Sequence, residues 1–213
     1  MPKTKPFDEH YEDYEKWFKI NKNVYLSELK AIQDFIPRHK KGMEVGIGSG
    51  LFALPLGIKD GVEPSKNMRV LAKNRGLNAI DGVAERLPYA SNTYDFVLMV
   101  TTICFVDDVK ISLFAIKRVL KQDGKFIVAF VDKDSTLGQC YLKNKEDSLF
   151  YKDANFYSTN TVLRLLNESG FKNPQIRQTV FGKLSDINEV QDFKDGHGEG
   201  SFVIISVINK KSI

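Results

Sequence analysis

The segment that most constrains how this chain can fold is residues 42–50, which read Gly-Met-Glu-Val-Gly-Ile-Gly-Ser-Gly. Residues 43–45 predict a short buried strand, and the three glycines that follow at every second position predict a tight turn. Without Cβ atoms, glycines adopt positive φ angles easily and let a ligand lie against bare backbone. A turn of this kind that passes into a helical segment offers free N–H groups, which favours a nucleotide-like ligand.

The glycine spacing distinguishes two ligand classes. Dinucleotide-binding turns use G-x-G-x-x-G, whose third glycine lies against the pyrophosphate. Here that position is Leu51, which disfavours a nicotinamide-dependent oxidoreductase. The arrangement Glu44-x-Gly46-x-Gly48-x-Gly50 instead resembles motif I of the class I S-adenosylmethionine (SAM)-dependent methyltransferases. A plain tight turn after a strand is the alternative at this position.

Length and composition predict a single globular domain over residues 1–213, with 42% hydrophobic and 27% charged residues. No apolar run has membrane-spanning length and the N-terminus lacks a signal-peptide core, so we expect a cytoplasmic protein. The two cysteines, Cys104 and Cys140, are far apart, and no His, Asp or Glu cluster has metal-ligand spacing. We therefore expect no metal.

Residues 7–37 are predicted to form a helical cover of two helices, 7–20 and 24–36, the second ending before a proline. The pattern Phe7-Asp8, Tyr14-Glu15 and Trp17 resembles the first helix of the type 11 methyltransferase branch, which includes ubiquinone and menaquinone biosynthesis enzymes. The resemblance implies that Tyr14 lies near the methionine end of SAM. Packing of this aromatic face on the sheet is the alternative.

A carboxylate at the end of the second predicted strand is suited to accept hydrogen bonds from both ribose hydroxyls. Glu63 occupies that position, 13 residues beyond the last glycine of the turn, which implies an abbreviated first helix. Pro64 would face the adenine, and Ser65 caps the next helix. The resemblance also adds Ile47 of the turn and Met68 of that helix to the candidate cofactor site.

The third predicted strand covers residues 77–83 and runs into the segment 82–89. This segment resembles the family's Gly-Asp-Ala-Glu-x-Leu-Pro-Phe. In that family the aspartate accepts from the adenine amino group and the next N–H meets a ring nitrogen. Here Val83 replaces the aspartate, while Ala84 retains the backbone contact. The resemblance leaves Glu85 or a water molecule as the acceptor for the amino group.

The continuous apolar run at residues 94–100 predicts a central strand buried on both faces. By resemblance, the junction that follows, Thr101 and Thr102, lies beneath the transferred methyl group. Phe105 stands where the family often has a histidine. The motif Asn-Pro-Pro-Tyr, by which enzymes that methylate nucleobase or amide nitrogens hold a planar group, is absent, which argues against a DNA adenine or glutamine target.

Alternating strands and helices predict a Rossmann-like, doubly wound α/β sheet. The resemblance specifies seven strands, six parallel and one antiparallel, the last two strands being residues 175–181 and 202–208. Ligands of such sheets lie outside the carboxyl ends of the parallel strands. Two long connections, residues 133–157 and 182–200, are therefore expected to line the substrate side.

The sequence thus predicts a methyltransferase that moves the methyl group of SAM to a small-molecule acceptor by in-line displacement, leaving S-adenosylhomocysteine. A general base is needed only if the acceptor must lose a proton, and the candidates are Asp132, Tyr151 and His197. Two alternatives remain open. A SAM-binding protein without transferase activity is suggested by Val83 and Phe105, and an RNA methyltransferase by the pI of about 8.9.

Overall fold

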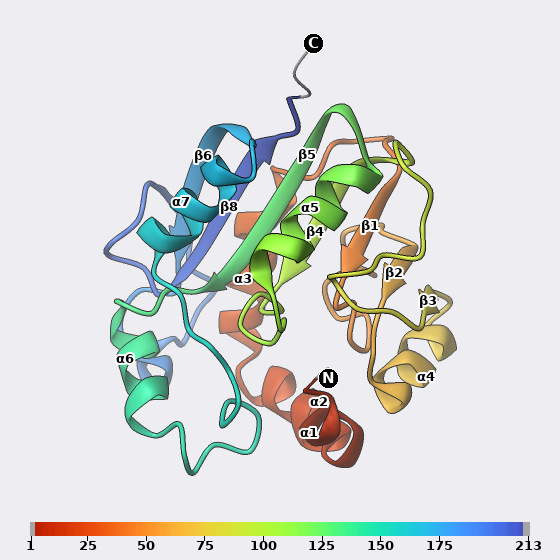
Figure 1. The fold of residues 1–213 in the computed structure, drawn as a ribbon. Helices are drawn as coiled ribbons and strands as arrows, with labels where there is room; N and C mark the ends of the chain where they lie inside the picture. Colours follow the sequence, from red (N-terminus) through yellow and green to blue (C-terminus); the bar gives the residue numbers. More distant parts are fainter. Residues whose placement is uncertain (1–2, 211–213) are drawn as a thin grey trace.

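The computed structural model describes residues 3–210 of the chain. An eight-stranded sheet in the order β3-β2-β1-β4-β5-β8-β6-β7 forms its centre (Figure 1). Its strands are β1 (Gly42–Val45), β2 (Asp60–Val62), β3 (Asn78–Ile80), β4 (Tyr94–Val100), β5 (Leu120–Val131), β6 (Lys172–Thr179), β7 (Lys194–Asp195) and β8 (Phe202–Ile208).

The first five strands pair in parallel, whereas β8 is antiparallel to both β5 and β6. This confirms the doubly wound α/β class and the reversed strand β8. The predicted strand count was one too low, because β7 adds an edge strand antiparallel to β6. With two residues, β7 is too short to show an alternating pattern in the sequence.

Helices cover both faces of the sheet (Figure 1). Leu113 of α5 and Val162 of α7 belong to one buried core cluster, and Ile32 of α3 and Ala72 of α4 to the other. The helices are α1 (Lys5–Glu9), α2 (Tyr11–Ile20), α3 (Lys22–Gln33), α4 (Lys66–Asn74), α5 (Val109–Val119), α6 (Thr136–Lys143) and α7 (Thr159–Glu168), with a 3-10 turn at Leu184–Asp186. Among the described residues, no helix has both the length and the apolar character needed to cross a membrane.

The N-terminal cover differs in detail from its prediction. Residues 7–20 form two helices, because His10, with φ −126° and ψ 31°, leaves the helical region between α1 and α2. The predicted cap at Ser65 is confirmed, since its side chain accepts a hydrogen bond from the N–H three residues later. Asp108 and Ser158 cap α5 and α7 in the same way. The stretch between the glycine turn and β2 contains turns only, in agreement with the predicted short spacing.

Candidate functional site

The glycine turn after β1 has the backbone that its sequence predicts. Gly46, Gly48 and Gly50 have φ angles of 70°, 55° and 87°. A Cβ at Gly46 would lie 2.2 Å from Thr102 Oγ1, and one at Gly50 would lie 2.2 Å from Leu77 Cδ1. At Gly48 the nearest atom would be a methionine methyl at 3.5 Å, so this glycine leaves the turn open on the side where a ligand can approach.

Glu63 connects the end of β2 to the glycine turn. One carboxylate oxygen accepts from the Gly48 N–H at 2.9 Å and the other from the Ser65 N–H at 2.8 Å. The side chain is 8% exposed, and this burial raises its pKa to about 7 against the opposing effect of the two N–H groups. The carboxylate is thus fixed in place beside the opening of the turn.

Glu44 lies beneath the turn, in β1, and is fully buried. Desolvation raises its pKa well above the usual range, and the nearby Glu63 charge raises it further. Among the described residues, its Oε2 atom has no hydrogen-bond partner.

One cavity of about 250 Å³ runs along the carboxyl ends of β1, β2 and β4, and a second space of about 10 Å³ adjoins it through Thr101 and Tyr151. Only the larger space can hold more than a water molecule. Thr101 has a φ of 48°, an uncommon value for a β-branched residue. Such backbone strain is concentrated at functional sites.

Most of the predicted cofactor residues line the larger cavity. They are Tyr14, Gly46, Gly48, Glu63, Pro64, Met68, Val83, Ala84, Glu85, Thr101 and Thr102. Four of the predicted residues do not line the cavity: Glu44, Ile47, Gly50 and Ser65. They belong to β1, to the glycine turn and to the cap of α4. That these residues bind the cofactor stays a prediction.

Glu85 has a partner inside the protein. Its Oε1 accepts from the N–H groups of Asp107 at 2.7 Å and Asp108 at 3.1 Å, where the chain enters α5. The side chain therefore fastens the connection after β4 to the one after β3. Val83, next to it, offers the cavity an apolar side chain and forms an isolated bridge with Arg86.

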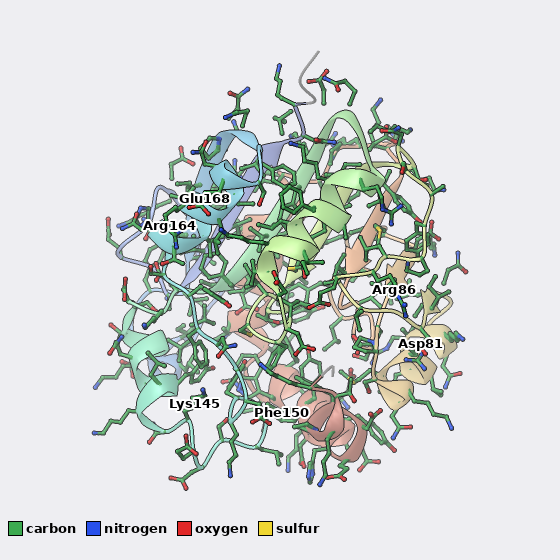
Figure 2. All side chains as sticks on the ribbon, viewed as in Figure 1. Asp81, Arg86, Lys145, Phe150, Arg164 and Glu168 are labelled. Atoms are coloured by element: carbon green, nitrogen blue, oxygen red, sulfur yellow. The ribbon has the colours of Figure 1, made fainter. Side chains whose placement is uncertain are left out.

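Part of the cavity wall is aromatic. Four rings line it, those of Phe7, Tyr14, Phe105 and Tyr151. The Phe105 ring lies 5.1 Å from Phe7 and 6.0 Å from Tyr151, measured between ring centroids. Phe150, at the bottom of Figure 2 beside the N-terminal helices, packs behind Phe7 and Tyr14.

The three candidate bases differ in position. Tyr151 lines the cavity, but burial raises the pKa of its hydroxyl well above the usual range, which opposes a role as phenolate base. Asp132 lies outside the cavity and accepts from Thr159 Oγ1 at 2.5 Å and from the Asp134 N–H at 2.9 Å. His197 is exposed and also outside the lining. The structure therefore opposes Asp132 and His197 as bases.

The two long connections also behave differently. Residues 133–157 contain α6 and supply Tyr151 to the cavity, as expected for a substrate-side segment. Residues 182–200 supply none of the lining and pack against α3 instead, through a 2.8 Å hydrogen bond from the Gln191 N–H to Ser27 Oγ and an ion pair between Lys30 and Asp192. Ile187 of this segment is buried in the same core cluster as Ile32 of α3.

The N-terminal helices are fastened over the cavity by polar contacts. Asp8 Oδ1 accepts from Ser65 Oγ at 2.7 Å, at the start of α4. Glu15 of α2 pairs with Arg75 and accepts from Ser49 Oγ in the glycine turn. The cover and the turn are thus joined by direct side-chain contacts.

Comparison with known proteins agrees with this geometry. The methyltransferase domain family matches residues 43–128. An uncharacterised protein of Methanocaldococcus jannaschii is 43% identical over 200 residues, 94% of this chain and 97% of that one. A demethylmenaquinone methyltransferase of Staphylococcus aureus is 24% identical over 174 residues, 67% of this chain and 72% of that one.

Among solved structures, a SAM-dependent methyltransferase of Thermotoga maritima, described as a possible histamine N-methyltransferase, superposes with a TM-score of 0.95. It is 44% identical, and the match covers 97% of this chain and all of that one. A sheet of this order with a glycine turn and a carboxylate at the end of β2 defines the class I SAM-dependent methyltransferase fold.

This chain belongs to that family, and SAM is its methyl donor. The residues present fit the donor, because the open backbone at Gly48 and the Glu63 carboxylate line one cavity. The resemblance inferred from the sequence is confirmed. Phe7, Phe105, Val106 and Asp107 also line the cavity and were not among the predicted cofactor residues. Phe7 had been noted only as part of the first-helix pattern and Phe105 only as a departure from the family.

Proposed function

We propose that this protein transfers the methyl group of SAM to a small-molecule acceptor that binds between the rings of Phe7, Tyr14, Phe105 and Tyr151. The observation that supports this most is the shape of the cavity. One continuous space joins the glycine turn and Glu63 to a chamber walled by rings from the N-terminal cover and two connections. We call this chamber, defined by those four rings, the aromatic chamber.

Bound SAM supplies a methyl group that is already activated on a sulfonium, so the protein acts mainly by positioning. Glu63 and the N–H groups of the glycine turn would hold the ribose and the methionine part. Thr101 and Thr102, at the junction where the two ends of the cavity meet, would lie beside the reacting atoms. The four rings exclude water and orient the acceptor.

The size of the chamber favours a small molecule over an RNA acceptor. Phe7 of α1 and Tyr14 of α2 are walls of the chamber, and the Phe150 ring, labelled in Figure 2 beside these helices, packs against both. Asp8 and Glu15 fasten this cover. An RNA base would have to pass beneath the cover to reach Thr101. Because the Thermotoga relative is described as a possible histamine N-methyltransferase, histamine belongs among the acceptors to be tested.

The test is formation of S-adenosylhomocysteine from SAM by the full chain in the presence of defined acceptors. One arm contains histamine and sets of small amines, phenols and carboxylic acids; the other contains total RNA. We expect product with a small molecule and none with RNA, and loss of that activity in Glu63→Ala. Turnover with RNA alone would overturn the proposal, as would SAM binding without turnover in any arm.

A further inference from the structure

Lys3 brings a positive charge to the wall of the cavity. Among the described residues that line this space, it is the one lysine or arginine. Its side chain is half-buried, and its ammonium group has no hydrogen bond or ion pair within residues 3–210. A partly desolvated charge without a partner is costly, and a lysine that served only the fold would extend into water or pair with a carboxylate.

Lys3 belongs to the same part of the wall as the aromatic chamber. Phe7 follows it by four residues, and the Phe7 ring lies 5.1 Å from the ring of Phe105. On its other side Phe105 stacks on Tyr151, at 6.0 Å between centroids and 12° between planes. The charge of Lys3 also opposes the rise in pKa that burial causes at the Cys104 thiol, so the ammonium is turned toward the interior.

The start of the N-terminal cover holds Lys3 in this place. Thr4, the next residue, begins α1, and its carbonyl oxygen accepts from the Asp8 N–H at 2.9 Å. Asp8 in turn accepts from Ser65 Oγ at 2.7 Å and from the Asn67 N–H at 3.2 Å, both at the start of α4. The contacts that fasten the cover therefore also fix the backbone beside Lys3.

The carboxylates of the cavity wall differ from Lys3, because the fold already compensates them. Glu63 and Glu85 each accept hydrogen bonds from two backbone N–H groups. The third acidic residue of the lining, Asp107, is exposed, so water and salt screen its charge. The charge that this wall leaves available to a ligand is therefore positive.

Tyr151 adds a neutral donor to the chamber. Its hydroxyl makes no hydrogen bond within residues 3–210, and burial raises its pKa well above the usual range, so it keeps its proton. A carboxylate can accept from this hydroxyl and from the Lys3 ammonium, and both hydrogen bonds are charge-assisted. The competing chemistry is an ammonium group on the ring faces, which the charge of Lys3 would repel.

We propose that the methyl acceptor is a small apolar molecule with a carboxylate, and that Lys3 selects it. The ammonium of Lys3 and the hydroxyl of Tyr151 bind the carboxylate, and the apolar part lies against the rings of Phe7 and Phe105. This inference rests on the proposed function and names the substrate class of that site. The donor's own carboxylate belongs to the N–H groups of the glycine turn, which leaves Lys3 to the acceptor.

The experiment measures binding to the full chain saturated with S-adenosylhomocysteine, so that it does not depend on turnover. The probes are two matched sets that differ in the polar group: 3-phenylpropionate, its amide and 3-phenylpropylamine, and hexanoate, its amide and hexylamine. Calorimetric titration is performed on wild type, Lys3→Met, Lys3→Arg and Lys5→Met. Lys5 is the matched control, because it lies two residues further on, outside the lining, with a side chain that is 82% exposed.

We expect at least one acid to bind about tenfold or more tightly than its amide and its amine. Lys3→Met should remove this preference, whereas Lys3→Arg and Lys5→Met should retain it. Added salt should weaken binding of the acid and leave binding of the amide unchanged. Affinity for S-adenosylhomocysteine should stay within about threefold of wild type in all variants, which also shows that each variant folds.

The inference is wrong if the amide or the amine binds wild type as tightly as the acid, or if no acid binds. An acid preference that survives in Lys3→Met, or that is lost equally in Lys5→Met, would also overturn it. Weaker binding of S-adenosylhomocysteine by Lys3→Met with an unchanged acid preference would assign Lys3 to the donor instead. Failure of the proposed function has a different signature, because wild type would then bind no S-adenosylhomocysteine or would methylate only RNA.

Discussion

The two ends of the cavity are constructed in different ways. The donor end consists of consecutive short segments joined by backbone hydrogen bonds, among them those from Gly48 and Ser65 to the Glu63 carboxylate. The aromatic chamber consists of side chains from α1, α2 and two connections, held by ring contacts of about 5–6 Å. We therefore expect donor binding to depend on local backbone, and acceptor choice on side chains that can change without disturbing it.

The largest expected effect comes from breaking the backbone of the donor end. Gly46→Ala places a Cβ within 3 Å of three Thr102 side-chain atoms at a φ of 70°, so we expect a loss of about 3 kcal/mol in the free energy of unfolding. Gly57→Ala is the matched control, with a similar φ of 72° and no atom within 4 Å. It should cost about 1 kcal/mol in urea unfolding. Equal losses would show that contact with Thr102 is unimportant.

Removal of the Glu63 carboxylate should affect ligand binding more than the fold. Glu63→Ala leaves two N–H groups unpaired and removes the predicted ribose acceptor, so affinity for SAM should fall about 100-fold. Glu146→Ala, at an exposed site, is the control. Calorimetric titration with SAM measures both variants, and an affinity within about threefold of wild type would exclude Glu63 from the donor site.

A smaller effect, of opposite sign, is expected at the buried Glu28 of α3. The pKa of Glu28 is raised from 4.5 to about 8 in the folded state, so ionisation penalises folding increasingly as pH rises between these values. Glu28→Gln removes the penalty and should stabilise the protein by about 2 kcal/mol at pH 8.5 and by much less at pH 4.5. Denaturant unfolding at both pH values tests this. A stabilisation independent of pH would show that Glu28 does not titrate in this range.

The smallest expected effect concerns the cover that spans both ends. Asp8→Ala removes the acceptor for Ser65 Oγ and the Asn67 N–H, at a partly exposed position. We expect the dissociation rate of SAM to increase about threefold, in line with the modest net value of such hydrogen bonds. Stopped-flow displacement measures it, with Asp13→Ala on the exposed side of α2 as control. An unchanged rate would show that the cover does not restrain the donor.

The same contrast explains what could be predicted from the sequence. The glycine turn, Glu63 and the cap at Ser65 depend on neighbouring residues, and the structure places them as their local patterns predicted. The division of the first helix at His10 and the two-residue strand β7 could not be predicted, because too few residues carry each signal.

The chamber required information that no local pattern contains. Phe7 and Phe105 are almost a hundred residues apart, yet their rings are 5.1 Å apart. Asp132 and His197 were candidates because of their position at the edge of the sheet. Asp132 accepts a hydrogen bond from Thr159, and His197 lies in the exposed connection after β7. Glu28 was hidden within an ordinary amphipathic helix, and only its burial without a partner distinguishes it.

The most direct test of the account is a calorimetric titration of SAM into wild type, Glu63→Ala and Tyr151→Ala under one set of conditions. If donor and acceptor occupy separate ends of one cavity, wild type and Tyr151→Ala should bind SAM with affinities within about threefold, and Glu63→Ala about 100-fold more weakly. Equal weakening in both variants would contradict the division of the cavity. Absence of SAM binding to wild type would contradict the donor site itself.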